Sequence, residues 1–127
     1  MESKGKKLKS KNVFQSFKYA FSGLKYGFIN TRNLRIDLLF IVAVIICGFI
    51  FKIHFVEWAI LLGCIALVTS LELMNTAIEE AVNLASPDIH PLAKVSKDVA
   101  AGAVLLSAII SAIIGIIIFL SKFIDMF

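Results

Sequence analysis

The chain has 127 residues, of which 59% are hydrophobic and only 17% are charged, and its mean hydropathy is +0.90. A 14.0 kDa globule has too little interior to bury that much apolar surface, so the composition excludes an ordinary soluble domain and predicts an integral membrane protein. The net charge of +4 comes largely from lysines near the amino terminus. These lysines favour anionic lipid headgroups, and nothing in the sequence indicates a nucleic-acid partner.

The amino-terminal third contains a basic tail and an amphipathic segment. Residues 1–11 (MESKGKKLKSK) lack apolar periodicity, which predicts a disordered tail ahead of one membrane-embedded domain over residues 12–127. Along residues 13–30, large apolar side chains recur at intervals of three and four: Phe14, Phe17, Phe21, Leu24 and Phe28. This spacing predicts a helix lying in the membrane interface. A helix packed against the membrane bundle from the same side is a compatible alternative.

Three further apolar segments predict three transmembrane helices and therefore an all-α fold. The first runs over about 36–53, and the second over about 56–84, including an extension that leaves the hydrocarbon near Glu72. Ser86-Pro87-Asp88 ends the second helix, and a polar loop is expected from Asp88 to about Val95. The third span covers about 97–121, of which residues 99–121 contain no charge over 23 positions.

Polar residues in the second helix form one stripe on an otherwise apolar surface. At about 100° per residue, five side chains fall within an arc of roughly 100°: Glu72, Asn75, Thr76, Glu79 and Asn83. A carboxylate within a bilayer costs about 2.5–3.5 kcal/mol, so residues of this kind usually face a protein interior and carry function. A helix end wetted by headgroup water is the alternative interpretation.

The basic residues predict the orientation. With the amino terminus inside the cell, the tail, the first helix and the loop after the second span carry 11 of the 13 lysines and arginines. The positive-inside rule therefore places the polar stripe at the cytoplasmic face of the cell membrane.

The cytoplasmic end thus gathers Glu72, Asn75, Glu79, Lys97 and Asp98. Carboxylates suit Mg²⁺, a lysine neutralises phosphate, and a carboxylate at the membrane surface can accept a proton from a lipid hydroxyl. The sequence contains no phosphate-binding loop and no protein-kinase signature. The residues alone therefore indicate a site that handles cations or phosphates.

Several motifs resemble the prokaryotic diacylglycerol kinase family, most closely its Gram-positive branch, the undecaprenol kinases. The motifs are residues 72–79 (ELMNTAIE), 90–94 (HPLAK) and 97–106 (KDVAAGAVLL), with the Gly23-Leu24 and Arg32-Asn33 pairs in the first segment. The resemblance covers residues from about 14 to 120. It implies a homotrimer whose subunits each have a surface helix and three spans, and which moves the ATP γ-phosphate to the hydroxyl of undecaprenol or, alternatively, diacylglycerol.

The resemblance also implies roles for individual residues. Glu72 would be the general base, Asn75 would help to place the reacting groups, and Glu79 would hold Mg²⁺. Lys97 and Asp98, like Glu79, would contact the nucleotide.

Three positions depart from the family pattern. Thr31 stands where a second metal-binding glutamate is usual, Asn83 replaces an aspartate, and Asp37 replaces a histidine or glutamate. Asp37 lies about 240° around the helix from Thr31, which places it on a different face. Glu80 or Asn83 can help instead, and ATP phosphates supply further oxygens.

Two functions of other classes remain as rivals to a lipid kinase. Intramembrane carboxylates also build proton or cation paths, although this stripe lies at one membrane face and not mid-span. A non-catalytic relative that binds ATP or lipid is the second rival, because Thr31 leaves the metal site incomplete.

Overall fold

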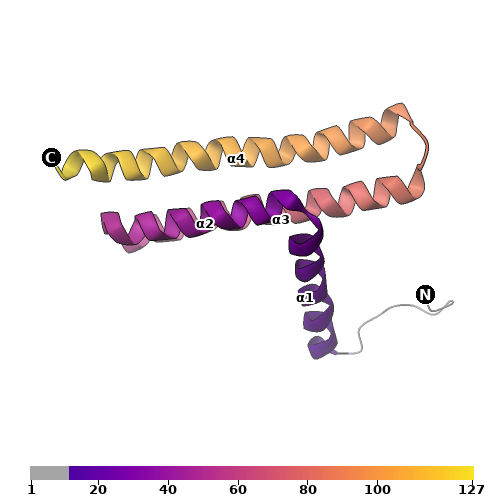
Figure 1. Ribbon diagram of the computed structural model, residues 1–127, viewed down its shortest axis with the longest axis horizontal. Coiled ribbons are helices and arrows are strands. Elements are labelled where there is room, and N and C mark those ends of the chain that lie inside the picture. Colours follow the sequence, from indigo (N-terminus) through magenta and orange to yellow (C-terminus); the bar gives the residue numbers. More distant parts are fainter. Residues whose placement is uncertain (1–11) are drawn as a thin grey trace.

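The computed structural model describes residues 12–127, and the tail expected over residues 1–11 lies outside this part of the chain. The described residues form four α-helices and no strand: α1 (Val13–Asn30), α2 (Arg32–Phe51), α3 (Phe55–Ala85) and α4 (Pro91–Asp125). Helices α2, α3 and α4 run side by side, whereas α1 projects across their direction from the start of α2 (Figure 1). The prediction of an all-α protein with one surface helix and three spans is confirmed.

Each of the three side-by-side helices is long enough to cross a membrane. Helix α2 has 20 residues, and α3 and α4 have 31 and 35. At 1.5 Å per residue they are about 30, 46 and 52 Å long, against a hydrocarbon core of about 30 Å. All three are also apolar enough to cross a membrane, so this is a multi-pass membrane protein. Helices α3 and α4 extend past the junction between α1 and α2 (Figure 1).

The bundle buries little apolar surface within one chain. A small core joins Ile53, Leu61 and Ile118 at the end of the bundle opposite the α3–α4 loop. Most large apolar side chains on the three spans are instead exposed on the isolated chain. Exposed apolar faces of this extent require contact with lipid or with other protein.

The junction between α1 and α2 turns the chain within a single residue. Thr31 has extended backbone angles, and its N–H still donates to the Gly27 carbonyl at 2.9 Å. The Arg35 guanidinium donates to the carbonyls of Phe28 and Ile29, which are among the unpaired acceptors at the end of α1. Gly27 is buried, and a Cβ there would lie 2.5 Å from Leu73 Cδ2, so α1 crosses α3 closely at this point.

The turn between α2 and α3 is held by its own caps. Lys52 adopts a left-handed conformation with φ 55° and ends α2. The Glu57 carboxylate accepts from the His54 N–H at 2.9 Å and pairs with Lys122 of α4 at 3.2 Å. This end of α3 is therefore fixed both to its own turn and to α4.

The loop between α3 and α4 is shorter than predicted. A polar loop was expected to reach about Val95, but α4 already begins at Pro91. Proline lacks the N–H that would be unpaired in the first turn, and the His90 imidazole accepts from the Leu92 N–H at 3.1 Å. Lys97 and Asp98 consequently lie within a helix, nearly two turns from its start.

Candidate active site

The polar stripe of α3 contains one deeply buried carboxylate. Glu72 is only 6% exposed, whereas Glu79, two turns further along the helix, is exposed. Between them, the Asn75 amide donates to Glu79 Oε2 over a long 3.5 Å, and its Oδ1 is buried without a partner among the described residues. The stripe therefore runs from a shielded acid to an accessible one, with an unused amide acceptor between.

Glu72 faces a second acid, from α2. Its carboxyl group interacts with that of Asp37 and lies within reach of the charge on Glu79. Asp37 Oδ2 is buried and has no hydrogen-bond partner in the described part of the chain. Buried polar atoms are nearly always paired, so Asp37 Oδ2 is an acceptor for the hydroxyl of a ligand or for water.

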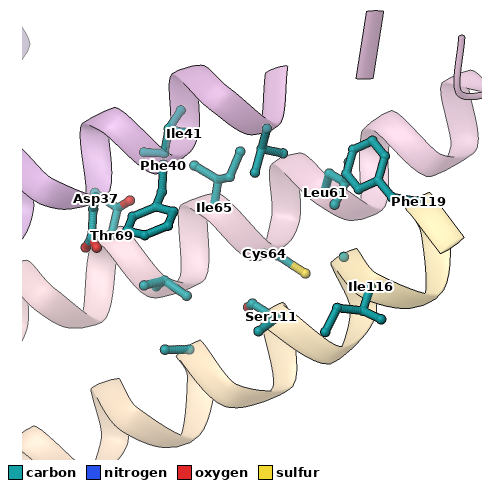
Figure 2. Close-up of a pocket in the computed structure, with 15 residues that line it drawn as sticks. Asp37, Phe40, Ile41, Leu61, Cys64, Ile65, Thr69, Ser111, Ile116 and Phe119 are labelled. Atoms are coloured by element: carbon teal, nitrogen blue, oxygen red, sulfur yellow. The ribbon is translucent and has the colours of Figure 1, made fainter. Parts of the chain in front are cut away.

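An apolar groove leads away from this acid pair. It has a volume of about 580 Å³ and lies between α2, α3 and α4. Figure 2 shows Asp37 and Thr69 at one end, and Leu61 and Phe119 at the other. The walls between them are aliphatic or aromatic, with Cys64 and Ser111 as small exceptions. A groove of this kind inside a membrane bundle fits a hydrocarbon chain with a polar head at the Asp37 end.

A polar cavity of about 430 Å³ lies at the α1–α2 junction, against α3. Its lining combines amides, hydroxyls, carboxylates and one guanidinium: Tyr26, Asn30, Thr31, Arg32, Asn33, Thr76, Glu79 and Glu80. A cation beside two carboxylates and several neutral oxygens is the chemistry expected for a phosphate group that carries a divalent metal.

Two side-chain contacts fix the walls of this cavity. Thr31 Oγ1 lies 3.3 Å from Thr76 Oγ1, and the Thr76 hydroxyl donates to the Glu72 carbonyl at 3.1 Å. Since a hydroxyl has one hydrogen, Thr31 is the donor to Thr76. The Tyr26 hydroxyl donates to Glu80 Oε2 at 2.9 Å, and this carboxylate raises the pKa of the Tyr26 phenol. Helices α1 and α3 are thus joined across the cavity mouth.

Lys97 and Asp98 do not line this cavity. Asp98 pairs with Lys94 at 2.6 Å on the exposed surface of α4, and Lys97 is half-buried one residue earlier. The structure therefore brings Glu79 and Thr31 together in one cavity and Glu72 beside Asp37, but leaves the α4 residues outside both groups.

The donor groups of the cavity are suited to Mg²⁺ only when a ligand adds further oxygens. No group of three or more His, Cys, Asp or Glu side chains within residues 12–127 is arranged to hold a metal by itself. Two carboxylates, three hydroxyls and two side-chain amides nevertheless supply oxygen ligands, and Mg²⁺ is commonly held by one or two carboxylates together with substrate phosphates. Asn75, whose amide donates to Glu79, does not itself line the cavity. The residues fit a metal that arrives with a phosphate ligand.

Sequence reasoning missed the pairing partners in this region. Tyr26 carries no distinguishing pattern in the sequence, and Asp37 stands out only as a departure from a family pattern. Tyr26 contacts Glu80, which lies 54 positions away in the sequence. Asp37 of α2 contacts Glu72 of α3. A charged side chain in an apolar segment indicates that Asp37 has a functional or pairing role, but it does not identify the partner.

These features define a multi-pass, α-helical membrane protein in which a hydrocarbon-sized groove and a separate cavity suited to phosphate both lie against α3. A family model described as "Prokaryotic diacylglycerol kinase" matches residues 18–119, and the chain therefore belongs to this family.

The relatives carry two different names. An undecaprenol kinase of Bacillus subtilis is 43% identical over 122 residues, which cover 96% of this chain and 99% of the relative. A diacylglycerol kinase of Synechocystis is 44% identical over 105 residues, covering 82% of this chain and 60% of the relative. A diacylglycerol kinase of Escherichia coli K12 is 24% identical over 111 residues, covering 87% of this chain and 91% of the relative.

Proposed function

We propose that this protein is an ATP-dependent lipid kinase that phosphorylates the hydroxyl of undecaprenol at the cytoplasmic face of the cell membrane. The observation that carries this proposal is the position of Glu72. It is a buried acid on the helix that borders both the apolar groove and the polar cavity, beside Asp37 at the polar end of the groove. A lipid hydroxyl that reaches Glu72 has its chain in the apolar groove and a phosphate donor on its polar side.

The proposed reaction assigns one role to each group. Glu72 accepts the proton of the lipid hydroxyl as the oxygen forms a bond to the γ-phosphorus. The bond between that phosphorus and the β–γ bridging oxygen breaks, and ADP leaves. Asn75 helps to place the reacting groups, and its side-chain amide donates to Glu79 Oε2 at 3.5 Å. Arg32 at the cavity wall balances phosphate charge.

Glu79 is the proposed ligand of Mg²⁺, which would neutralise charge on the β- and γ-phosphates. Lys97 and Asp98 are proposed to contact the nucleotide from α4. Asp98 already pairs with Lys94, so in this role the contact with ATP competes with an exposed ion pair, which costs little to break.

We propose undecaprenol as the first candidate for the lipid substrate, because the undecaprenol kinase relative matches along nearly the whole of both chains. Diacylglycerol remains the second candidate, since a relative of similar identity is named a diacylglycerol kinase.

The test is phosphoryl transfer by the purified full-length chain in lipid nanodiscs, with labelled ATP and equal mole fractions of undecaprenol and dioleoylglycerol. We expect label to appear chiefly in undecaprenyl phosphate. Chief labelling of phosphatidic acid would select the second candidate. The absence of lipid-dependent labelling would contradict kinase function, and proton flux into liposomes would then identify a translocating subunit.

The proposed assembly is a homotrimer. The extensive exposed apolar faces of α2, α3 and α4 support association as well as lipid contact. Light scattering with correction for bound detergent should give a protein mass of three 14.0 kDa chains. A mass of one or two chains would contradict the trimer.

A further inference from the structure

The polar cavity contains more negative charge than Glu79 alone supplies. Glu80 lines the same cavity, although neighbouring residues on a helix point about 100° apart. Both carboxylates reach it because α1 and the start of α2 form the opposite wall, so the cavity spans more than one face of α3.

The other residues considered as partners for Glu79, namely Asp37, Asn83 and Asp98, lie elsewhere. Asp37 faces Glu72 at the end of the apolar groove, and Asp98 pairs with Lys94. Asn83 is exposed and does not line the cavity. Among the described residues, Glu80 is thus the second carboxylate at this cavity.

Tyr26 holds Glu80 in this position. Its hydroxyl donates to Glu80 Oε2 at 2.9 Å. This bond occupies one carboxylate oxygen, and Tyr26 does not bond to the other, Oε1. Both side chains are substantially exposed, so without this bond the Glu80 side chain would sample several rotamers in solvent. A carboxylate already fixed by a hydrogen bond loses less entropy when it binds a cation, and hydrogen bonds to ligating carboxylates typically tune metal affinity.

We propose that Glu80, positioned by Tyr26, is the second carboxylate that binds the divalent cation of the metal–ATP complex in this protein. This inference rests on the proposed function, since the cation arrives with the nucleotide. It assigns to Tyr26 a positioning role on α1 and to Glu80 a metal-binding role on α3. Thr31 lines the same cavity and contributes a neutral hydroxyl. A glutamate at position 31 would place a carboxylate in this cavity.

The experiment measures metal binding directly. The full-length chain in nanodiscs is titrated with Mn²⁺ in the presence of a non-hydrolysable ATP analogue, and free Mn²⁺ is followed by electron paramagnetic resonance. We expect Glu80→Gln to weaken Mn²⁺ binding about tenfold or more, and Tyr26→Phe to weaken it about threefold. The double variant Tyr26→Phe with Glu80→Gln should bind no more weakly than Glu80→Gln alone, because Tyr26 acts through Glu80.

A matched control and a rescue separate local binding from general charge. Asp88→Asn removes one negative charge from the α3–α4 loop, outside the cavity, and should leave Mn²⁺ affinity unchanged. Adding Thr31→Glu to Glu80→Gln should restore affinity, because it returns a carboxylate to the same cavity.

The outcomes distinguish this inference from the proposed function. If the wild-type chain transfers phosphate to lipid but Glu80→Gln binds Mn²⁺ as tightly as wild type, the inference is wrong and the kinase function stands. If Glu80→Gln and Asp88→Asn weaken binding equally, Glu80 acts only through bulk charge and the inference is again wrong. A wild-type chain that neither binds Mn²⁺ with the nucleotide nor phosphorylates lipid would overturn both.

Discussion

At the scale of single residues, Glu72 is the acid on which the proposed chemistry depends. Burial at 6% exposure beside Asp37 separates it from bulk water, while Glu79 and Glu80 remain accessible to a nucleotide. The acids of the stripe differ in exposure, and this difference suits them to different roles. The buried end of the stripe is suited to proton transfer and the exposed end to cation and phosphate binding.

We expect Glu72→Gln to lower turnover by about 10²–10⁴-fold, the usual loss for a general base. Glutamine has the same shape but cannot accept the hydroxyl proton, so thermal stability and Mn²⁺–nucleotide binding should stay near wild type. The measurement is the steady-state rate at saturating ATP and undecaprenol. Turnover within about twofold of wild type would remove Glu72 from this role.

Thr31 offers a test of the metal requirement. Its hydroxyl is bonded to Thr76 and carries no charge, so adding a carboxylate at this position should strengthen cation binding in the cavity. We expect Thr31→Glu to shift the Mg²⁺ dependence of the rate to lower concentration and Thr31→Ala to leave it near wild type. The titration is run at saturating lipid. Coincidence of all three curves would place Thr31 away from the metal.

At the scale of helices, the sequence predicts what depends on local pattern. The apolar runs fixed the number of spans, and the three-and-four spacing of phenylalanines located α1 at residues 13–30, as observed. The polar residues after Pro91 predict a loop, but α4 begins earlier than this prediction because His90 and Pro91 start a helix there. Polarity alone does not end a helix once its first turn is capped.

Patterns of this kind do not predict which residues of different helices contact each other. The pairing of Asp37 with Glu72 depends on the register in which α2 packs along α3, and Tyr26 meets Glu80 only because Gly27 lets α1 approach Leu73 closely. Periodicity identifies the helix face on which a residue lies, but it does not give the register in which two helices pack along each other.

Helix packing between α2 and α3 gives a further prediction. A Cβ at Gly48 would lie 2.5 Å from the Trp58 ring, which is itself packed against Phe49, whereas a Cβ at Gly63 meets nothing within 4 Å. We expect Gly48→Ala to destabilise the protein by about 1–3 kcal/mol through overpacking. Gly63→Ala, the matched control, should be neutral or stabilising by up to about 1 kcal/mol. Thermal unfolding in detergent measures both, and equal midpoints would contradict the predicted close packing.

At the scale of the whole molecule, the structure joins one surface helix to three spans, and the charge distribution predicts which end faces the cytoplasm. Eleven of the 13 basic residues lie in the tail, α1, the start of α2 and the start of α4. The α3–α4 loop and the carboxyl terminus lie at opposite ends of α4, so the two should be accessible from opposite sides (Figure 1).

We expect a membrane-impermeant maleimide to label Asp88→Cys only in inside-out vesicles and Phe127→Cys only in right-side-out vesicles. The wild-type chain gives the background from Cys47 and Cys64, which lie within the spans α2 and α3. The reverse pattern would contradict the positive-inside assignment.

The length of α2 has a consequence for the choice of host membrane. This helix is about 30 Å long and is bounded by Arg32 at one end and Lys52 at the other, so it spans a hydrocarbon core of ordinary thickness with little to spare. In a bilayer of longer acyl chains, hydrophobic mismatch would tilt the bundle or pull the Arg32 end toward the hydrocarbon. Because the polar cavity is built around that end of α2, acyl-chain length would alter the depth at which the nucleotide and the lipid hydroxyl meet.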